Sequence, residues 1–183
     1  MCIRDSPKIT PVQERTNELA ITEESDYDAA KIAFDNKEFD SALDKFMKFI
    51  ESYPEGELTN QSNYYIASSF FELEKWSESI EAYSLFINLN SDSLLLGEAY
   101  LQMGQAYAVL EKWTDAARSY LSAFQYDREA SIAPNALFYL GLSLDKIGQR
   151  QESCQTINEV IVRYPDAPIV STAMKEMQIM ECQ

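Results

Sequence analysis

Residues 110–120 read LEKWTDAARSY, and residues 73–83 read LEKWSESIEAY. Trp76 and Trp113 occupy the same place in these two stretches and are 37 residues apart. The same step, taken outward from the two tryptophans, reaches Phe39 and Arg150, so the unit occurs four times. A fixed period between about 20 and 50 residues is typical of stacked repeat arrays. The repeat therefore decides the fold class.

Each unit contains two segments whose apolar or small residues are three, four and seven positions apart, the spacing of one face of an α-helix. In the first unit, Asp35-Asn36-Lys37 is a short polar turn between the segments, so the two helices should lie antiparallel. Small residues recur at two positions of the repeat. At the first, where the two helices should cross, they are Ala30, Ala67, Gly104 and Gly141. At the second, where an aromatic ring should face them, they are Ala42, Ser79, Ala116 and Ser153. We predict that large and small side chains interlock in register.

We predict an all-α fold, a right-handed α-solenoid of four helical hairpins with a C-terminal capping helix. Residues 1–24 mix prolines and charges without a sustained helical period, so we expect a flexible leader. The solenoid domain should span residues 25–183, with repeats at about 26–59, 60–96, 97–133 and 134–167 and the capping helix at about 168–181. This last helix should cover the apolar face that the fourth repeat leaves open.

The composition favours a folded binding protein over an enzyme. Of the 183 residues, 46% are apolar and 12% aromatic, which is enough to build a core. Thirty acidic against fifteen basic residues give a net charge of −15, which disfavours nucleic acid as a partner and is compatible with a basic protein partner. Histidine, the usual general base and a common metal ligand, is absent. We therefore expect no catalytic residue, no metal site and no cofactor.

The three cysteines, Cys2, Cys154 and Cys182, show no paired short spacing of the kind that binds zinc, and their odd number excludes complete pairing within the chain. A Cys154–Cys182 disulfide is conceivable, but we favour isolated thiols that pack as small apolar groups. No stretch of about 18 apolar residues occurs, so we expect no membrane span.

Two patterns suggest chemistry, and each has a simpler structural interpretation. Gly141-Leu142-Ser143 resembles the surroundings of a nucleophile, but the sequence has no histidine to activate the serine. Neighbouring carboxylates such as Glu72 and Glu74 are more typical of a solvated helix face than of a metal or acid–base site.

The remaining candidate site is a surface, because the first helix of each hairpin lines the concave side of such a stack. The repeat places these residues there: Tyr27, Lys31 and Phe34, then Tyr64, Ser68 and Phe71, then Leu101, Gln105 and Ala108, then Phe138, Leu142 and Asp145. Exposed aromatic residues often anchor a partner, and we expect Tyr64, Phe71 and Phe138 to do so. Packing against neighbouring repeats is the alternative for each of them. For Trp76 and Trp113 we favour packing.

The order of small residue, aromatic residue, small residue and proline resembles the tetratricopeptide repeat, whose usual period is about 34 residues. The additional residues of this chain fall between repeats, in Glu55-Gly56-Glu57-Leu58 and Asp92-Ser93-Leu94-Leu95.

A second resemblance is to the periplasmic cell division coordinator family of the Tol-Pal system. PNAL at 134–137, LGLSL at 140–144 and VRYP at 162–165 look like its final repeat, and FMKFIESYP at 46–54 is similar to its first. Asn90 and Ser91 replace the Tyr-Pro expected after the second repeat.

This resemblance implies a non-enzymatic protein–protein interaction scaffold in the periplasm that coordinates cell division and envelope constriction. The implied partners are a Tol-Pal component and a peptidoglycan synthase. An oligomer is expected only through the family's N-terminal coiled coil, which is not found in this chain. The alternative is a structural subunit of an outer-membrane protein assembly machine, of the TPR lipoprotein type.

Overall fold

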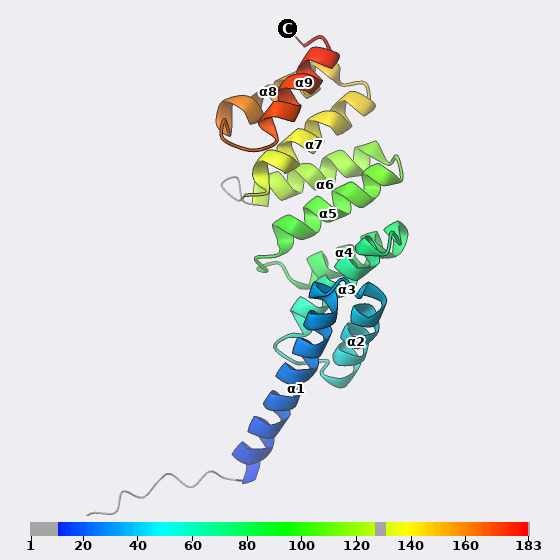
Figure 1. Cartoon of the computed structure of the whole chain (residues 1–183), viewed down its shortest axis with the longest axis vertical. Coiled ribbons are helices and arrows are strands. Elements are labelled where there is room, and N and C mark those ends of the chain that lie inside the picture. Colours follow the sequence, from blue (N-terminus) through cyan, green and yellow to red (C-terminus); the bar gives the residue numbers. More distant parts are fainter. Residues whose placement is uncertain (1–10, 127–130, 183) are drawn as a thin grey trace, which may run out of the picture.

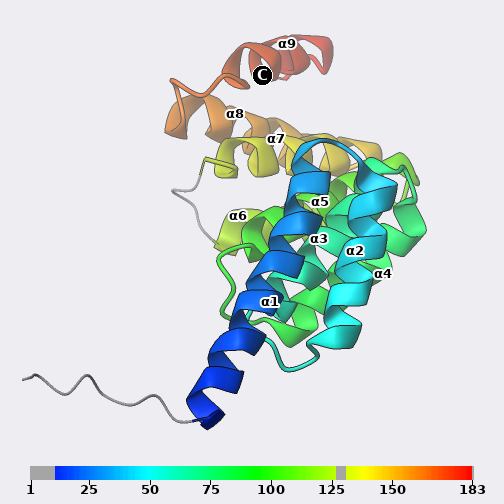
Figure 2. The same ribbon diagram turned by 60° about the horizontal axis from the view of Figure 1, so that its bottom comes forward.

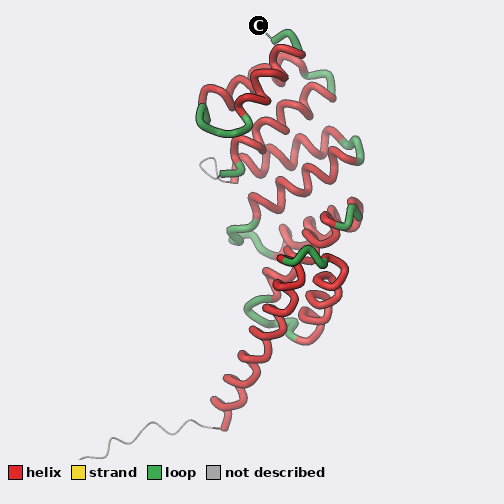
Figure 3. The backbone as a smooth tube through the Cα atoms, in the orientation of Figure 1, coloured by secondary structure: helices red, strands yellow, loops and turns green. Residues whose placement is uncertain are grey.

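The computed structural model describes residues 11–126 and 131–182, with side chains from residue 22 onward. Every regular element in these two ranges is a helix, as Figure 3 shows. The prediction of an all-α fold is confirmed.

Eight of the described helices form four consecutive hairpins, which are stacked along the long axis of the molecule (Figure 1). The hairpins are α1 (Pro11–Asp35) with α2 (Phe39–Ser52), α3 (Thr59–Glu72) with α4 (Trp76–Leu89), α5 (Leu96–Val109) with α6 (Trp113–Tyr126), and α7 (Ala133–Lys146) with α8 (Arg150–Arg163). Helix α9 (Val170–Ile179) follows and packs on α8. The four positions related by the 37-residue step, from Phe39 to Arg150, are the first residues of the four second helices.

Helix α1 differs from the expected leader. It begins at Pro11, so the part of residues 1–24 that the structure describes is helical and continues without a break to Asp35. Proline is well tolerated in the first turn of a helix, where its missing N–H needs no partner. The helix is connected to the loop after α2, because the Tyr53 hydroxyl donates a hydrogen bond to Asp26 (2.8 Å) and the Leu58 amide donates one to Glu23 (3.4 Å). Residues 1–10 lie outside the described part.

The turn inside each hairpin contains one residue with a left-handed backbone. These residues are Lys37, Glu74, Glu111 and Gly148, with φ of 63°, 58°, 57° and 83°, and they too are 37 positions apart. In this conformation the next amide reaches back to the first helix, as when Glu38 N–H donates to the Ala33 carbonyl (2.9 Å) and Lys75 N–H to that of Phe70 (2.9 Å). The same backbone turn thus closes all four hairpins.

Small residues permit the helices of each hairpin to approach closely, as predicted. A Cβ atom built on Gly104 would lie 2.7 Å from the Tyr120 ring, and one on Gly141 would lie 2.5 Å from Ile157. Ala67 occupies the same position in the second hairpin, where its carbonyl accepts a hydrogen bond from the Ser79 hydroxyl (3.1 Å). Bulky and small residues therefore interlock at the crossings of the third and fourth hairpins.

We expect Gly104→Ala to lower the free energy of unfolding by about 1–2 kcal/mol. The gain in helix propensity, about 1 kcal/mol, is outweighed by overpacking against the buried Tyr120 ring. Urea denaturation followed by circular dichroism measures the change. Gln105→Ala, on the same helix but half-buried at the surface, is the control and should be close to neutral. A stability gain in Gly104→Ala would contradict the packing described above.

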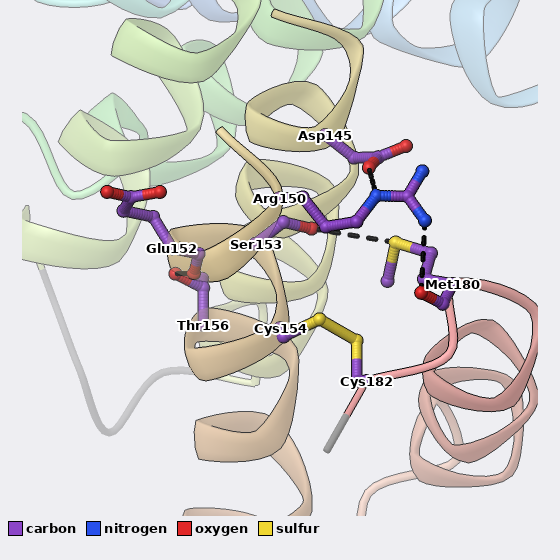
Figure 4. The surroundings of a disulfide bond; sticks show 8 residues. All are labelled: Asp145, Arg150, Glu152, Ser153, Cys154, Thr156, Met180 and Cys182. Carbon is purple, nitrogen blue, oxygen red and sulfur yellow. Dashed lines mark hydrogen bonds and ion pairs between the residues drawn. A yellow bond between two sulfur atoms is a disulfide. The ribbon is translucent and has the colours of Figure 1, made fainter. Parts of the chain in front are cut away.

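The structure corrects the expectation of isolated thiols. Cys154 on α8 and Cys182 after α9 form a disulfide, with a Cα–Cα distance of 5.6 Å (Figure 4). Arg150 lies beside it, where its Nε is 3.0 Å from an Asp145 carboxylate oxygen and its Nη1 donates to the Met180 carbonyl (3.0 Å). The end of the capping helix is therefore connected to both α7 and α8. The spacing of the cysteines in the sequence could not show this, because it does not indicate that the chain after α9 returns to α8. Cys2 lies outside the described residues.

Cys154→Ser combined with Cys182→Ser should lower the free energy of unfolding by about 2–4 kcal/mol, because the disulfide closes a long loop in the unfolded chain. Amide hydrogen exchange should accelerate most in α9. Cys2→Ser serves as the control and should leave both measurements unchanged. Equal exchange rates in α9 of the double variant and the parent protein would show that the disulfide does not hold this helix.

Candidate protein-binding surface

The first helices of the hairpins lie on the inner side of the stack. Helix α1 contacts α3 and α3 contacts α5, whereas α2, α4 and α6 each pack between two successive first helices (Figures 1 and 2). We define the inner wall as a set of at least partly exposed residues on α1, α3, α5 and α7. These residues are Lys31, Phe34, Asp35, Tyr65, Phe71, Glu72, Glu98, Leu101, Gln102, Gln105, Ala108, Val109, Tyr139, Leu142 and Asp145.

Four of the residues predicted for this surface are buried instead: Tyr27, Tyr64, Ser68 and Phe138. The Tyr27 ring packs edge-on against Phe46 and Phe49, both at 5.8 Å between ring centroids. The Tyr64 ring packs edge-on against Tyr83 and Phe86 of α4, with 5.9 and 5.6 Å between ring centroids. The expected anchors Tyr64 and Phe138 are therefore core residues, and the packing alternative holds for them.

The other predicted residues remain accessible on the inner wall. Phe71 is half-buried, with its ring edge-to-face on Trp76 at 5.2 Å. Phe34 packs against Phe39 and Tyr65, and Asp145 is paired with Arg150. The half-buried residues that complete the predicted set are Lys31, Leu101, Gln105, Ala108 and Leu142. Trp76 and Trp113 are half-buried at matching positions, consistent with packing, and Lys146 Nζ lies 5.7 Å from the Trp113 ring centroid.

Sequence reasoning missed part of this surface. Tyr65 stacks on Phe46 with 5.2 Å between centroids and receives Lys31 Nζ 5.3 Å above its ring. Val109 ends α5 with 55% of its side chain exposed. Each of these residues directly follows a predicted position, because the exposed side of a helix with 3.6 residues per turn includes pairs of adjacent residues. That rule could have identified them.

Tyrosine hydroxyls connect successive repeats at the edge of the inner wall. Tyr27 donates to the Gln61 side-chain oxygen (3.0 Å). Thirty-seven residues later, the Tyr64 hydroxyl lies 3.2 Å from a Glu98 carboxylate oxygen and 3.1 Å from the Gln102 side-chain oxygen. Tyr83 donates to the same oxygen of Gln102. These contacts fix Glu98 and Gln102 on α5 against the second hairpin.

Burial raises the pKa of Tyr64 far above its usual value, and the nearby Glu98 carboxylate adds to the shift. Burial likewise raises the pKa of Tyr83 and of Tyr120. These three hydroxyls therefore remain protonated in the folded protein at pH values where free tyrosine ionises.

The free energy of unfolding should be level up to about pH 9 and fall above pH 10, the ordinary tyrosine pKa. In that range the unfolded chain releases tyrosine protons that the folded chain retains, so rising pH favours unfolding. Urea denaturation at a series of pH values measures this decline. Tyr64→Phe should make it shallower. Equal slopes in Tyr64→Phe and the parent protein would contradict the assignment to buried tyrosines.

The inner wall combines apolar patches with carboxylates. Glu72 and Glu98 are exposed there, and Asp35 is paired with Lys31 at 2.5 Å. In the part of the chain that the structure describes, no group of three or more histidine, cysteine, aspartate or glutamate residues is arranged to hold a metal ion. Nor does any described helix have the length and apolar character needed to cross a membrane. The inner wall is thus an acidic, partly apolar surface, and these properties suit contact with a macromolecular partner.

Comparison with protein families assigns the chain. A model described as T7SS, ESX-1 secretion system protein EccA1, N-terminal domain, matches residues 16–179. The chain belongs to this family. Assignment to the Tol-Pal family is not supported by these comparisons. No curated protein matches the chain.

Solved structures confirm a tetratricopeptide-like fold. A crystal structure of MamA protein shares 18% identity over 87% of this chain and 85% of that one, with a TM-score of 0.68. YrrB, described as a TPR protein with an unusual peptide-binding site, shares 18% over 84% and 74%, with a TM-score of 0.68. TPR-like repeats of a putative kinesin light chain from Podosopora anserina share 12% over 88% and 86%, also with a TM-score of 0.68. Identities this low establish the fold alone.

Proposed function

We propose that this protein is a non-enzymatic scaffold whose inner wall binds a basic, partly apolar segment of a protein partner. One observation carries the proposal: the accessible apolar residues of the inner wall lie among exposed carboxylates. Leu101 and Val109 of α5 lie on the same wall as the exposed Glu98 of that helix and Glu72 of α3.

Such a surface favours a segment with two kinds of side chain. Apolar side chains gain free energy by covering Phe71, Leu101 and Leu142, at roughly 25 cal/mol for each Å² removed from water. Lysine or arginine side chains of the partner pair with Glu72 and Glu98, and the net charge of −15 accelerates their approach. An acidic segment would be repelled by the same carboxylates.

The comparisons are consistent with such a role. YrrB, which has a related fold, is described as having an unusual peptide-binding site. The matching family model describes one domain of a secretion system protein. We propose that the present chain serves to recognise a protein.

The location and partners implied by the Tol-Pal resemblance remain proposals. The Cys154–Cys182 disulfide supports an oxidising compartment such as the periplasm. A Tol-Pal component and a peptidoglycan synthase are candidate partners in that compartment, with cell division as the process. A structural role in an outer-membrane assembly machine is the alternative.

A random peptide library displayed on phage tests the proposal directly. Selection on the full chain should enrich peptides that contain lysine or arginine together with apolar residues. For a selected peptide, Phe71→Ala combined with Leu101→Ala should weaken binding at least tenfold, which corresponds to about 1.4 kcal/mol. Isothermal titration calorimetry measures the dissociation constant.

Leu85→Ala combined with Val162→Ala provides the matched control. Both residues are exposed, at 53% and 72%, but they lie on the second helices α4 and α8 and not on the inner wall. This control should bind like the parent protein. Equal losses in the two double variants, or enrichment of acidic peptides, would reject the inner wall as the binding surface.

A further inference from the structure

The junction between the second and third repeats has Asn90 and Ser91 in place of the Tyr-Pro pair that follows the first and fourth repeats. Asn90 stands where the first and fourth repeats have Tyr53 and Tyr164, each of which is followed by proline. The backbone is the same at all three positions, with φ and ψ of −133° and 56° at Asn90, −128° and 60° at Tyr53, and −127° and 56° at Tyr164. The difference is therefore one of side-chain size and chemistry.

The loop that follows also has the same form. Ser93 N–H donates to the Asn90 carbonyl (3.1 Å), as Gly56 N–H does to that of Tyr53 (3.0 Å) and Ala167 N–H to that of Tyr164 (2.9 Å). The second junction contains a pocket between this loop and the start of α3. We call this space the junction pocket. It has a volume of about 490 Å³, and its lining includes Glu57, Gln61, Leu89, Asn90, Asp92 and Leu94.

The amide of Asn90 is incompletely paired. The side chain is only 6% exposed, and its Nδ2 donates to the Phe86 carbonyl (2.8 Å). Its Oδ1 is buried and accepts no hydrogen bond from any described residue. Exchange of the two amide atoms would place an oxygen against the Phe86 carbonyl, so the orientation is fixed. A buried oxygen without a donor is destabilising, and an N–H group entering from outside would remove that cost.

The surroundings indicate which N–H group fits. The carboxylates of Glu57 and Asp92 line the pocket, and no basic side chain among the described residues does so. Leu94 and Leu89 are 91% and 61% exposed and form an apolar part of the pocket lining. A positively charged N–H donor on an aliphatic stem matches all three features, because such side chains cover apolar surface with the stem while the charged end meets oxygen atoms.

The pocket is held in shape by the next repeat. The Tyr126 hydroxyl at the end of α6 donates to the Ser93 carbonyl (2.7 Å), and the Ser93 hydroxyl accepts from Leu95 N–H (3.2 Å). The loop that carries Asp92 and Leu94 is thus fixed before any ligand arrives, which reduces the entropy lost on binding.

We propose that the junction pocket binds a lysine or arginine side chain of a protein partner. The Asn90 amide oxygen accepts one of its N–H groups, Glu57 and Asp92 balance the charge, and Leu89 and Leu94 cover the stem. The site lies at the loop edge of the stack and does not depend on the inner wall, so it can be tested separately from the proposed function.

Titration of the ¹⁵N-labelled full chain with Nα-acetyl-lysine methylamide or Nα-acetyl-arginine methylamide tests the site. We expect saturable NMR shifts of the Asn90 side-chain amide and of the Ser93 and Leu95 backbone amides, with a dissociation constant on the order of a millimolar. Nα-acetyl-norleucine methylamide, which has the stem without the charge, should cause none. Absence of shifts with both cationic probes, as expected if only water enters the pocket, would overturn the proposal.

Asn90→Tyr is the decisive variant, because tyrosine already occupies the same backbone position in two other repeats and should fold there. It should weaken binding of both cationic probes at least tenfold without loss of stability. Glu57→Gln combined with Asp92→Asn should also weaken it. Glu78→Gln combined with Glu81→Gln removes two charges from α4 outside the pocket and should have no effect. Unchanged binding in Asn90→Tyr, or equal losses in the two charge variants, would show that the general acidity of the protein binds the probes.

Discussion

The contact of a bulky side chain with a glycine at the crossings of the third and fourth hairpins sets how closely their helices approach. Gly104 under Tyr120 and Gly141 under Ile157 leave no room for even a methyl group. Because this contact recurs at a fixed interval, each hairpin presents the same face to the next, and the first helices fall on one side. The inner wall, the tyrosine contacts between repeats and the position of the capping helix all depend on this close approach.

The same regularity explains why chemical differences between repeats are informative. Where the backbone is constant, a changed side chain alters only its own surroundings. Tyr64 and Leu101 occupy equivalent positions, yet one is buried and hydrogen bonded across repeats while the other remains partly open. Asn90 likewise keeps the backbone of Tyr53 and changes only what the junction can accept. Binding properties can therefore vary from repeat to repeat without any cost to the fold.

The fold was predictable because its signal repeats: a 37-residue step located the first residue of each second helix, Trp76 and Trp113 among them. The surface was less predictable. A projection of the repeat places Tyr64 and Phe138 near the inner side, but only coordinates show that their rings turn into the core. The disulfide and the helix at residues 11–24 were missed for related reasons. The spacing of the cysteines does not show that the chain after α9 returns to α8, where the disulfide forms. The segment at residues 11–24 is polar and has no apolar stripe, so its sequence shows no helical period.

The identical left-handed turn inside each hairpin restricts where this protein can change length. Lys37, Glu74 and Glu111 each occupy the single residue that reverses the chain, so an insertion there would rotate the second helix away from its partner. Length can vary in the connections from one hairpin to the next. Those that the structure describes in full, between α2 and α3, α4 and α5, and α8 and α9, emerge along one margin of the stack (Figure 1). Evolutionary insertions and deletions should therefore accumulate on that margin, leaving the opposite margin uniform, and new specificities can arise by altering connections while every helix remains in register.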